Sequence, residues 1–140
     1  MSRKVYQEIS VLEASKQRIT ETFDTLERIY ISFSGGKDST VMMHLVCQEA
    51  RKRGRTVGVL IIDLEAQYRA TIEHIKNMVE EYKDCIDLHW FCGELLLRNA
   101  VSDYEPKWVC WDEDKKDIWV RDKLKNIRKV SMIVTGKPCF

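Results

Sequence analysis

The sequence lacks a long hydrophobic run and a strong excess of charge of either sign. Its 140 residues include 23 lysines and arginines against 22 aspartates and glutamates, for a formal net charge of +1. No segment approaches the roughly 18 consecutive apolar residues of a membrane span, and no apolar signal core follows the basic N-terminus. We therefore predict a cytoplasmic protein without membrane contact, in which any nucleic-acid contact is local.

Patterns typical of disulfide frameworks and zinc sites are also missing. The number of cysteines is odd, no two cysteines have CxxC spacing, and no histidine has a second ligand at zinc spacing. These residues are Cys47, Cys85, Cys92, Cys110 and Cys139, and His44, His74 and His89. We predict reduced thiols and no metal role for the histidines. With only two prolines and no linker or repeat, the chain is expected to form one domain over residues 1–140.

Apolar residues alternate between helical and strand patterns over the first 93 residues. Helical spacing predicts amphipathic helices over residues 5–26, from about 38 to a stop at Gly54, and over 68–82. Short β-branched, aromatic or continuous apolar runs predict strands over 29–33, 57–62 and 86–91. This order predicts an α/β fold, a Rossmann-like open and mainly parallel sheet flanked by helices with right-handed crossovers.

The pattern is weaker after Gly93. We expect a short helix over 95–101, an irregular aromatic segment over 105–111 and a helix with a basic face over 118–130. Residues 1–93 are thus the predicted core. Residues 94–140 are predicted to form a C-terminal extension, with an incomplete, truncated extension as an open alternative. The basic stretch from Lys123 to Lys129 is interpreted as a solvated helix face.

The segment Ser34-Gly-Gly-Lys-Asp-Ser39 lies between the first predicted strand and its helix, where α/β sheets bind ligands. Two glycines let the backbone approach an anion closely and its N–H groups form a nest. The helix N-terminus adds unpaired donors and a favourable dipole. Lys37 adds a positive charge, and Ser34, Ser39 and Thr40 add hydroxyl donors. The segment predicts a phosphate-binding loop.

Asp38 is unusual in such a loop, because a carboxylate repels phosphate. We expect it to cap the following helix, with contact to a phosphate-bridging Mg²⁺ ion as the alternative. The loop matches neither GxxxxGK[ST] nor GxGxxG.

Acidic and aromatic residues further along the chain are additional candidates. Asp63, at the predicted end of the second strand, is expected to hold Mg²⁺ or to contact the nucleotide sugar. The alternative for Asp63 is a position in a solvent-exposed loop. For Glu65, the exposed loop is the favoured interpretation. Trp108, Trp111 and Trp119 could stack on bases beside neighbouring lysines, but we favour a core role because acidic residues cancel the local charge.

Three stretches together resemble a known family. The loop with its strand, Ile31 to Val41, looks like the PP-loop of the adenine nucleotide α-hydrolase-like superfamily, and within it the phosphoadenosine phosphosulfate (PAPS) reductases and sulfurtransferases. Residues 61–65, followed by Tyr68 and Thr71, are similar to that family's acidic strand end. Residues 108–121 resemble a narrower bacterial and phage branch related to immunoglobulin-binding regulator A.

The resemblance covers roughly residues 5–121 and implies an ATP- or PAPS-like adenine nucleotide, with Mg²⁺ as a possible companion. It places the α–β phosphate region on the loop, adenine near residues 61–63, and Arg121 near the nucleotide. The implied nucleotide-binding residues are Phe33, Ser34, Gly35, Gly36, Lys37, Asp38, Ser39, Thr40 and Asp63, with Lys37 and Asp38 as the candidate catalytic pair.

Three functions remain open. An enzyme would cleave the α–β phosphate bond of ATP or handle a sulfonucleotide. PAPS reductases use a cysteine in a C-terminal Glu-Cys-Gly-[Leu/Ile]-His motif, whereas residues 136–140 here read Gly-Lys-Pro-Cys-Phe, which argues against sulfonate reduction. The alternatives are a non-catalytic nucleotide-binding co-regulator that acts with a DNA-binding partner, and an inactive truncated fragment.

Overall fold

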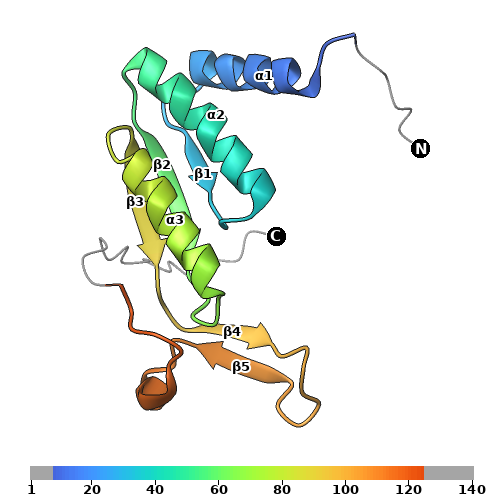
Figure 1. The fold of residues 1–140 in the computed structure, drawn as a ribbon, viewed down its shortest axis with the longest axis vertical. Coiled ribbons are helices and arrows are strands. Elements are labelled where there is room, and N and C mark those ends of the chain that lie inside the picture. Colours follow the sequence, from blue (N-terminus) through green and yellow to red (C-terminus); the bar gives the residue numbers. More distant parts are fainter. Residues whose placement is uncertain (1–7, 125–140) are drawn as a thin grey trace, which may run out of the picture.

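A computed structural model describes residues 8–124 of the chain. Helices and strands alternate from α1 to β3, and two further strands and a short 3-10 helix follow (Figure 1). They are α1 (Val11–Thr25), β1 (Tyr30–Ser32), α2 (Lys37–Arg53), β2 (Val57–Ile62), α3 (Arg69–Glu81), β3 (Ile86–Phe91), β4 (Leu95–Arg98), β5 (Lys107–Cys110) and the 3-10 helix η1 (Glu113–Ile118). The three predicted helices and three predicted strands of the first 93 residues are confirmed.

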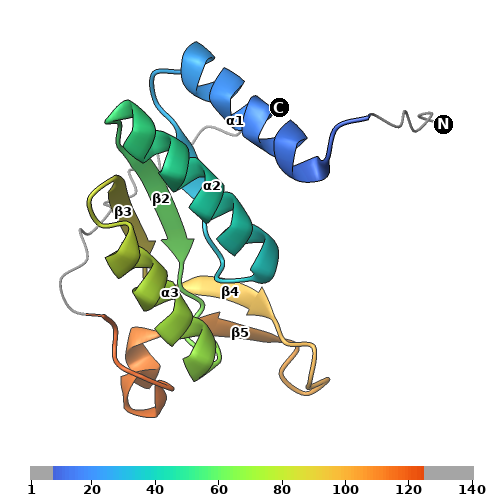
Figure 2. The ribbon, with the colours of Figure 1, turned by 45° about the horizontal axis from the view of Figure 1, so that its top comes forward.

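The first three strands form a parallel sheet in the order β1-β2-β3. Ile31 on β1 pairs with Val59 on β2, and Val59 pairs with Leu88 on β3. Both α2 and α3 lie over the same face of this sheet (Figures 1 and 2). This confirms the α/β, Rossmann-like architecture, and it brings the carboxyl ends of the three strands to one edge.

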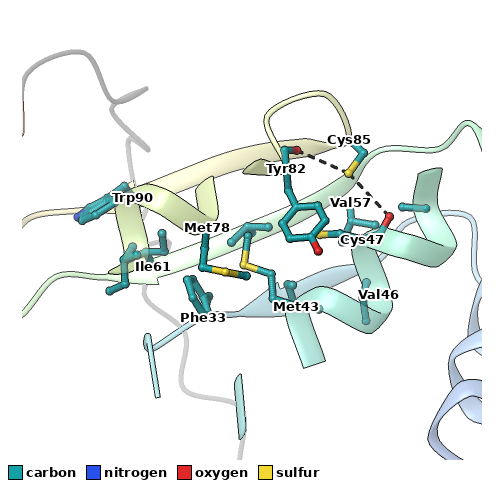
Figure 3. Packing of buried hydrophobic residues seen from close by; sticks show 14 of the residues in the cluster. Phe33, Met43, Val46, Cys47, Val57, Ile61, Met78, Tyr82, Cys85 and Trp90 are labelled. Atoms are coloured by element: carbon teal, nitrogen blue, oxygen red, sulfur yellow. Dashed lines mark hydrogen bonds between the residues drawn. The ribbon is translucent and has the colours of Figure 1, made fainter. Parts of the chain in front are cut away.

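The hydrophobic core fills the space between this sheet face and the two helices. Phe33, Ile61, Met43 and Met78 are all buried and lie together in Figure 3. Burial of each large apolar side chain contributes roughly 1.5–3 kcal/mol relative to leaving it exposed. The core therefore supports the strand ends from which the candidate site is built.

Helix α1 lies against α2 rather than on the sheet. It starts with a capping box, in which the Glu13 amide donates to Ser10 Oγ at 3.2 Å and the Ser10 amide donates to Glu13 Oε2 at 3.0 Å. In the described part of its predicted apolar stripe, Phe23 is buried and Ile19 is half-buried. Ile9, Leu12 and Leu26 are exposed.

The C-terminal end of α1 is held by Arg55, which lies between α2 and β2. The Arg55 guanidinium donates to the carbonyl oxygens of Phe23, Leu26 and Glu27 at 2.6 to 2.7 Å, so these carbonyls, free of helical partners, are satisfied. Gly54 ends α2 in the left-handed conformation with φ of 61°, as its position predicts.

Beyond Gly93 the expectations were wrong. Residues 95–98 form a strand rather than a helix, and residues 107–110 form its antiparallel partner rather than an irregular segment. Pairing along the two strands outweighs the helical propensity of the Leu95–Leu97 run, since its side chains find cross-strand neighbours. The hairpin extends away from the parallel sheet (Figures 1 and 2).

The predicted basic helix over 118–130 is also absent where the structure describes it. Ile118 ends η1, and residues 119–124 have no helical assignment; residues 125–130 lie outside the described part. Among residues 8–124, no helix is both long enough and apolar enough to cross a membrane.

Candidate functional site

The predicted phosphate loop joins the end of β1 to the start of α2. The Phe33 amide donates to the Leu60 carbonyl oxygen at 2.8 Å, which continues the sheet pairing up to the loop. Gly35 adopts a φ of 75°, and Gly36 is the residue that precedes the first turn of α2. The loop therefore directs its backbone toward the N-terminus of a 17-residue helix, where the first amides have no partner within the helix. The Gly36 amide donates to Ser34 Oγ at 3.4 Å.

Only glycine fits at position 35. A Cβ atom there would lie 2.7 Å from Cγ1 of Ile75 and 3.1 Å from Cγ2 of Thr71, both on α3. Positive φ adds a strain of about 1–2 kcal/mol for residues with a side chain. The first glycine of the loop is thus required both by its conformation and by the close approach of α3.

Three hydroxyl groups surround the loop. The Ser34 and Ser39 Oγ atoms are 3.1 Å apart, and Ser39 Oγ donates to the Gly36 carbonyl oxygen at 3.0 Å. Thr40 Oγ1 donates to the same carbonyl at 2.9 Å and also lies 2.9 Å from His74 Nε2. The structure therefore gathers the predicted serine and threonine hydroxyls at one turn of backbone.

Lys37 and Asp38 project into solvent from the first turn of α2. Their side chains are 88% and 89% exposed, and Lys37 Nζ donates to Asp38 Oδ1 at 2.8 Å. The expectation that Asp38 caps α2 is wrong, because Gly36 occupies the cap position and has no side-chain hydrogen bond. Asp38 lies inside the first turn, where the helix dipole favours a carboxylate.

Asp63 follows β2 directly and is completely buried. Its carboxylate accepts hydrogen bonds from Trp90 Nε1 at 2.8 Å and from the Glu65 amide at 2.9 Å. The Cys92 thiol donates at 3.5 Å, and Arg121 Nη2 forms an ion pair with Oδ1. These four donors offset the cost of removing a carboxylate from water. The alternative reading of a solvent-exposed loop is wrong.

Glu65 is also buried, with only 7% of its surface exposed and a φ of 60°. The Trp111 amide donates to its Oε2 at 2.6 Å, and the Val120 amide donates to Oε1 at 3.4 Å. Trp111 Nε1 donates in addition to the Asp63 carbonyl oxygen at 2.7 Å. The expectation of an exposed Glu65 fails because the segment after β5 folds back over the end of β2.

The tryptophans beside this end of β2 pack as a cluster. Trp111 is fully buried and meets Trp119 edge to face at 5.3 Å between ring centres. The Arg121 guanidinium lies 5.0 Å from the centre of the Trp111 ring. The favoured core role is confirmed for Trp111. Arg121 lies at the carboxyl end of β2, where it pairs with Asp63, and its position near a nucleotide stays a prediction.

The metal-ligating side chains and the buried thiols of residues 8–124 are further candidates for chemistry. No group of three or more His, Cys, Asp or Glu side chains in this part is placed to hold a metal ion. Asp38 supplies an exposed carboxylate at the loop, so a Mg²⁺ ion there would need further oxygens from a bound phosphate. Burial raises the pKa of Cys47 and of Cys92 to about 12, which keeps both as weakly nucleophilic thiols.

Sequence reasoning missed one neighbour of the loop. His74 contacts Thr40, and its ring meets Phe33 at 6.3 Å between ring centres. Helical spacing places residue 74 on the same face as Thr71 and Ile75, but only the packing of α3 on the loop reveals the contact.

Comparison with known proteins is consistent with this geometry. The phosphoadenosine phosphosulfate reductase domain matches residues 28–136, and the chain belongs to that family. The chain is also 44% identical over 114 residues to YbdN of Escherichia coli strain K12, which is described as uncharacterized. The matched region is 81% of this chain and 28% of YbdN, so the chain spans less than a third of that relative's length.

Proposed function

We propose that this member of the phosphoadenosine phosphosulfate reductase domain family binds the α–β phosphate region of ATP or of a PAPS-like adenine nucleotide at residues 34–40. The observation that carries the proposal is the left-handed Gly35 at the N-terminus of α2, with Lys37 exposed beside it. Backbone amides at a helix start attract anions through hydrogen bonding and through the helix dipole.

The charge next to the loop is available to a ligand. An exposed ion pair such as that of Lys37 with Asp38 contributes at most about 1 kcal/mol. A polyphosphate carries several charges and would replace Asp38 as the partner of Lys37. Asp38 would then be free to approach a Mg²⁺ ion held by the phosphate oxygens.

The other proposed site residues would act from beneath the ligand. Phe33 and Asp63 have buried side chains, 1% and 0% exposed, so support of the loop and of the strand edge is the role that fits them in this arrangement. The adenine ring would lie near the edge formed by residues 61–63. Contact of Phe33 and Asp63 with the nucleotide stays a prediction.

Turnover, where it occurs, would rest on electrostatic stabilisation. Loop amides at the start of α2 and the exposed Lys37 would stabilise negative charge that develops on a phosphate during cleavage of the α–β bond, and Mg²⁺ would add to this effect when bound. The oxygen or other nucleophilic atom of an acceptor, water or a second substrate, would bond to the α-phosphorus as the α–β bond breaks, which releases pyrophosphate and leaves adenylate on the acceptor. A sulfonucleotide could occupy the same loop through its phosphate.

Calorimetry with ATP–Mg²⁺ and with PAPS tests the proposal. We expect the wild type to bind at least one of them and Lys37→Ala to bind at least about tenfold more weakly, because it loses a charge-assisted contact. Lys83→Ala is the matched control. Like Lys37, Lys83 is an exposed lysine paired with a nearby carboxylate, that of Glu80, but it lies after the C-terminal end of α3, away from the loop. Equal binding by wild type and Lys37→Ala, or no binding, would refute the proposal.

A further inference from the structure

One face of α3 forms a wall of the phosphate loop. Thr71 and Ile75 approach the Cα position of Gly35, and His74 lies between them in sequence, on the same face of the helix. The loop is therefore confined not only by its own flanking elements, β1 and α2, but also by a helix that is more than 30 residues away in the chain.

His74 contacts both flanks of the loop. Its Nε2 atom is 2.9 Å from Thr40 Oγ1, in the first turn of α2. Its ring packs edge to face against Phe33, at the end of β1, with an angle of 61° between the rings. His74 thus contacts both the residue before the loop, Phe33, and the first turn of the helix after it, at Thr40.

The Thr40 contact also bears on the loop backbone. The Gly36 carbonyl oxygen accepts from the Thr40 amide at 2.9 Å, from Ser39 Oγ and from Thr40 Oγ1. A carbonyl oxygen has two lone pairs, so three donors compete for it. A bond between Thr40 and His74 gives the Thr40 hydroxyl a second partner and holds it, and the first turn of α2, in place.

We propose that His74 is a positioning residue for phosphate binding, one that orders the loop through Thr40 before a ligand arrives. The inference rests on the proposed function. A loop with two glycines has unusual backbone freedom, and ordering it on binding would cost affinity. The His74–Thr40 bond and the Phe33 contact restrict that freedom in the free protein, so the amides already converge where a phosphate binds.

Three substitutions separate the hydrogen bond from packing. His74→Phe keeps a ring against Phe33 but removes the bond to Thr40. His74→Gln keeps a polar nitrogen near the position of Nε2. The side chain of His74→Asn is one methylene shorter, so its amide does not reach Thr40. Thr40→Val removes the same bond from the other side while preserving side-chain shape.

The experiment is calorimetry of the 140-residue chain with ATP–Mg²⁺, with urea unfolding measured in parallel. We expect His74→Phe and His74→Asn to weaken binding about 3- to 10-fold, the range for loss of one hydrogen bond. His74→Gln should recover most of that loss. Adding His74→Phe to Thr40→Val should weaken binding no further, because both remove the same bond.

The outcomes distinguish this inference from its premise. Absence of binding by the wild type removes both. Binding by the wild type that Lys37→Ala abolishes but His74→Phe leaves unchanged overturns the positioning role and leaves the proposed function standing. A larger loss in His74→Gln than in His74→Phe would show that ring packing against Phe33 rather than the hydrogen bond matters, and would overturn the positioning role. Equal losses in these two variants, or independent losses in the double variant, would show that His74 does not act through its bond to Thr40, and would also overturn it.

Discussion

The guanidinium of Arg121 forms an ion pair with the carboxylate of Asp63, although 58 residues separate them in the chain. Asp63 is fully buried at the end of β2, and Arg121 belongs to the segment that returns after η1. This pair joins the parallel sheet to the part of the chain that follows the hairpin, and Trp90 on β3 donates a further hydrogen bond to the same carboxylate. It is the best indication that residues 111–121 are integral to the fold.

Removing either member of the pair should destabilise the protein strongly. We expect Asp63→Ala to lower the free energy of unfolding by about 3–5 kcal/mol, because it leaves Arg121 and the Trp90 indole without their acceptor. Arg121→Ala should lower it comparably, and the double variant should lose less than the sum of the two. Urea unfolding measures all three.

Asp103→Ala is the control for this experiment. Asp103 is exposed in the loop between β4 and β5, so its removal should change stability by less than about 0.5 kcal/mol. Equal effects of Asp63→Ala and Asp103→Ala would contradict the burial and bonding described for Asp63.

Two glycines with positive φ allow conformational strain to be separated from steric fit. A Cβ on Gly54 meets nothing within 4 Å, so Gly54→Ala should cost only the strain of about 1–2 kcal/mol. A Cβ on Gly35 meets Ile75 at 2.7 Å, and this overpacking should add about 1–3 kcal/mol to the same strain. Urea unfolding of both variants tests the difference, and a smaller loss for Gly35→Ala than for Gly54→Ala would refute it.

The capping box of α1 should make stability depend on pH in the acid range. The hydrogen bond from the Ser10 amide, followed by that from the Ser10 hydroxyl, lowers the pKa of Glu13 below its ordinary value of 4.5. A carboxyl whose pKa is depressed by folding stabilises the protein above its unfolded pKa and loses that contribution as the pH falls through the folded value.

Comparison of the wild type with Glu13→Gln tests this dependence. We expect the wild type to be more stable at neutral pH and the difference to shrink below pH 4.5. The matched control is Glu8→Gln, because Glu8 is an exposed glutamate just before the helix. Its free energy of unfolding should equal that of the wild type both at neutral pH and below pH 4.5. A difference between wild type and Glu13→Gln that persists at low pH would argue against the bonded carboxylate.

The buried thiols should resist alkylation at neutral pH. Their ionisation at alkaline pH should destabilise the folded protein. Burial raises the pKa of Cys47 to about 12, with the neighbouring Cys85 as the next cause, and the same environment is drawn in Figure 3. Because folding favours the protonated thiol, its contribution is full below the unfolded pKa of about 9 and is lost as the pH rises toward 12.

Alkylation followed by peptide mass spectrometry measures the first effect. At neutral pH we expect Cys47 and Cys92 to react slowly in the folded chain and rapidly in denaturant, because the thiolate is the reactive form and both thiols have limited access. Rapid labelling of Cys47 in the folded chain would contradict its burial between α2 and the sheet.

Local sequence patterns account for the first half of the fold. The Val57–Ile62 run predicts a strand, and β2, the central strand of the parallel sheet, has the same limits. Gly54 and the Gly35-Gly36 pair mark the end of one helix and the start of the loop. Each of these signals depends on residues close together in the chain, and for this reason it can be read without the fold.

The second half could not be predicted in the same way. Leu95–Leu97 has a composition that suits a helix, yet it pairs with residues ten or more positions later, and nothing local encodes that pairing. Glu65 was expected in an exposed loop and Asp63 at a strand end open to a ligand, yet the segment with Trp111 folds over both. In both cases a long-range contact decided the structure against the local preference.

The amino-acid sequence by itself determined the parallel α/β core and the glycine turn between β1 and α2 where the phosphate loop is predicted, because strand, turn and helix signals there are local and agree. Only the tertiary structure decided that Asp63 is a buried partner of Arg121, that Asp38 leaves the cap position to Gly36, and that His74 contacts Thr40. These relationships depend on which distant segments pack together, and packing is a property of the whole folded chain rather than of any single stretch of it.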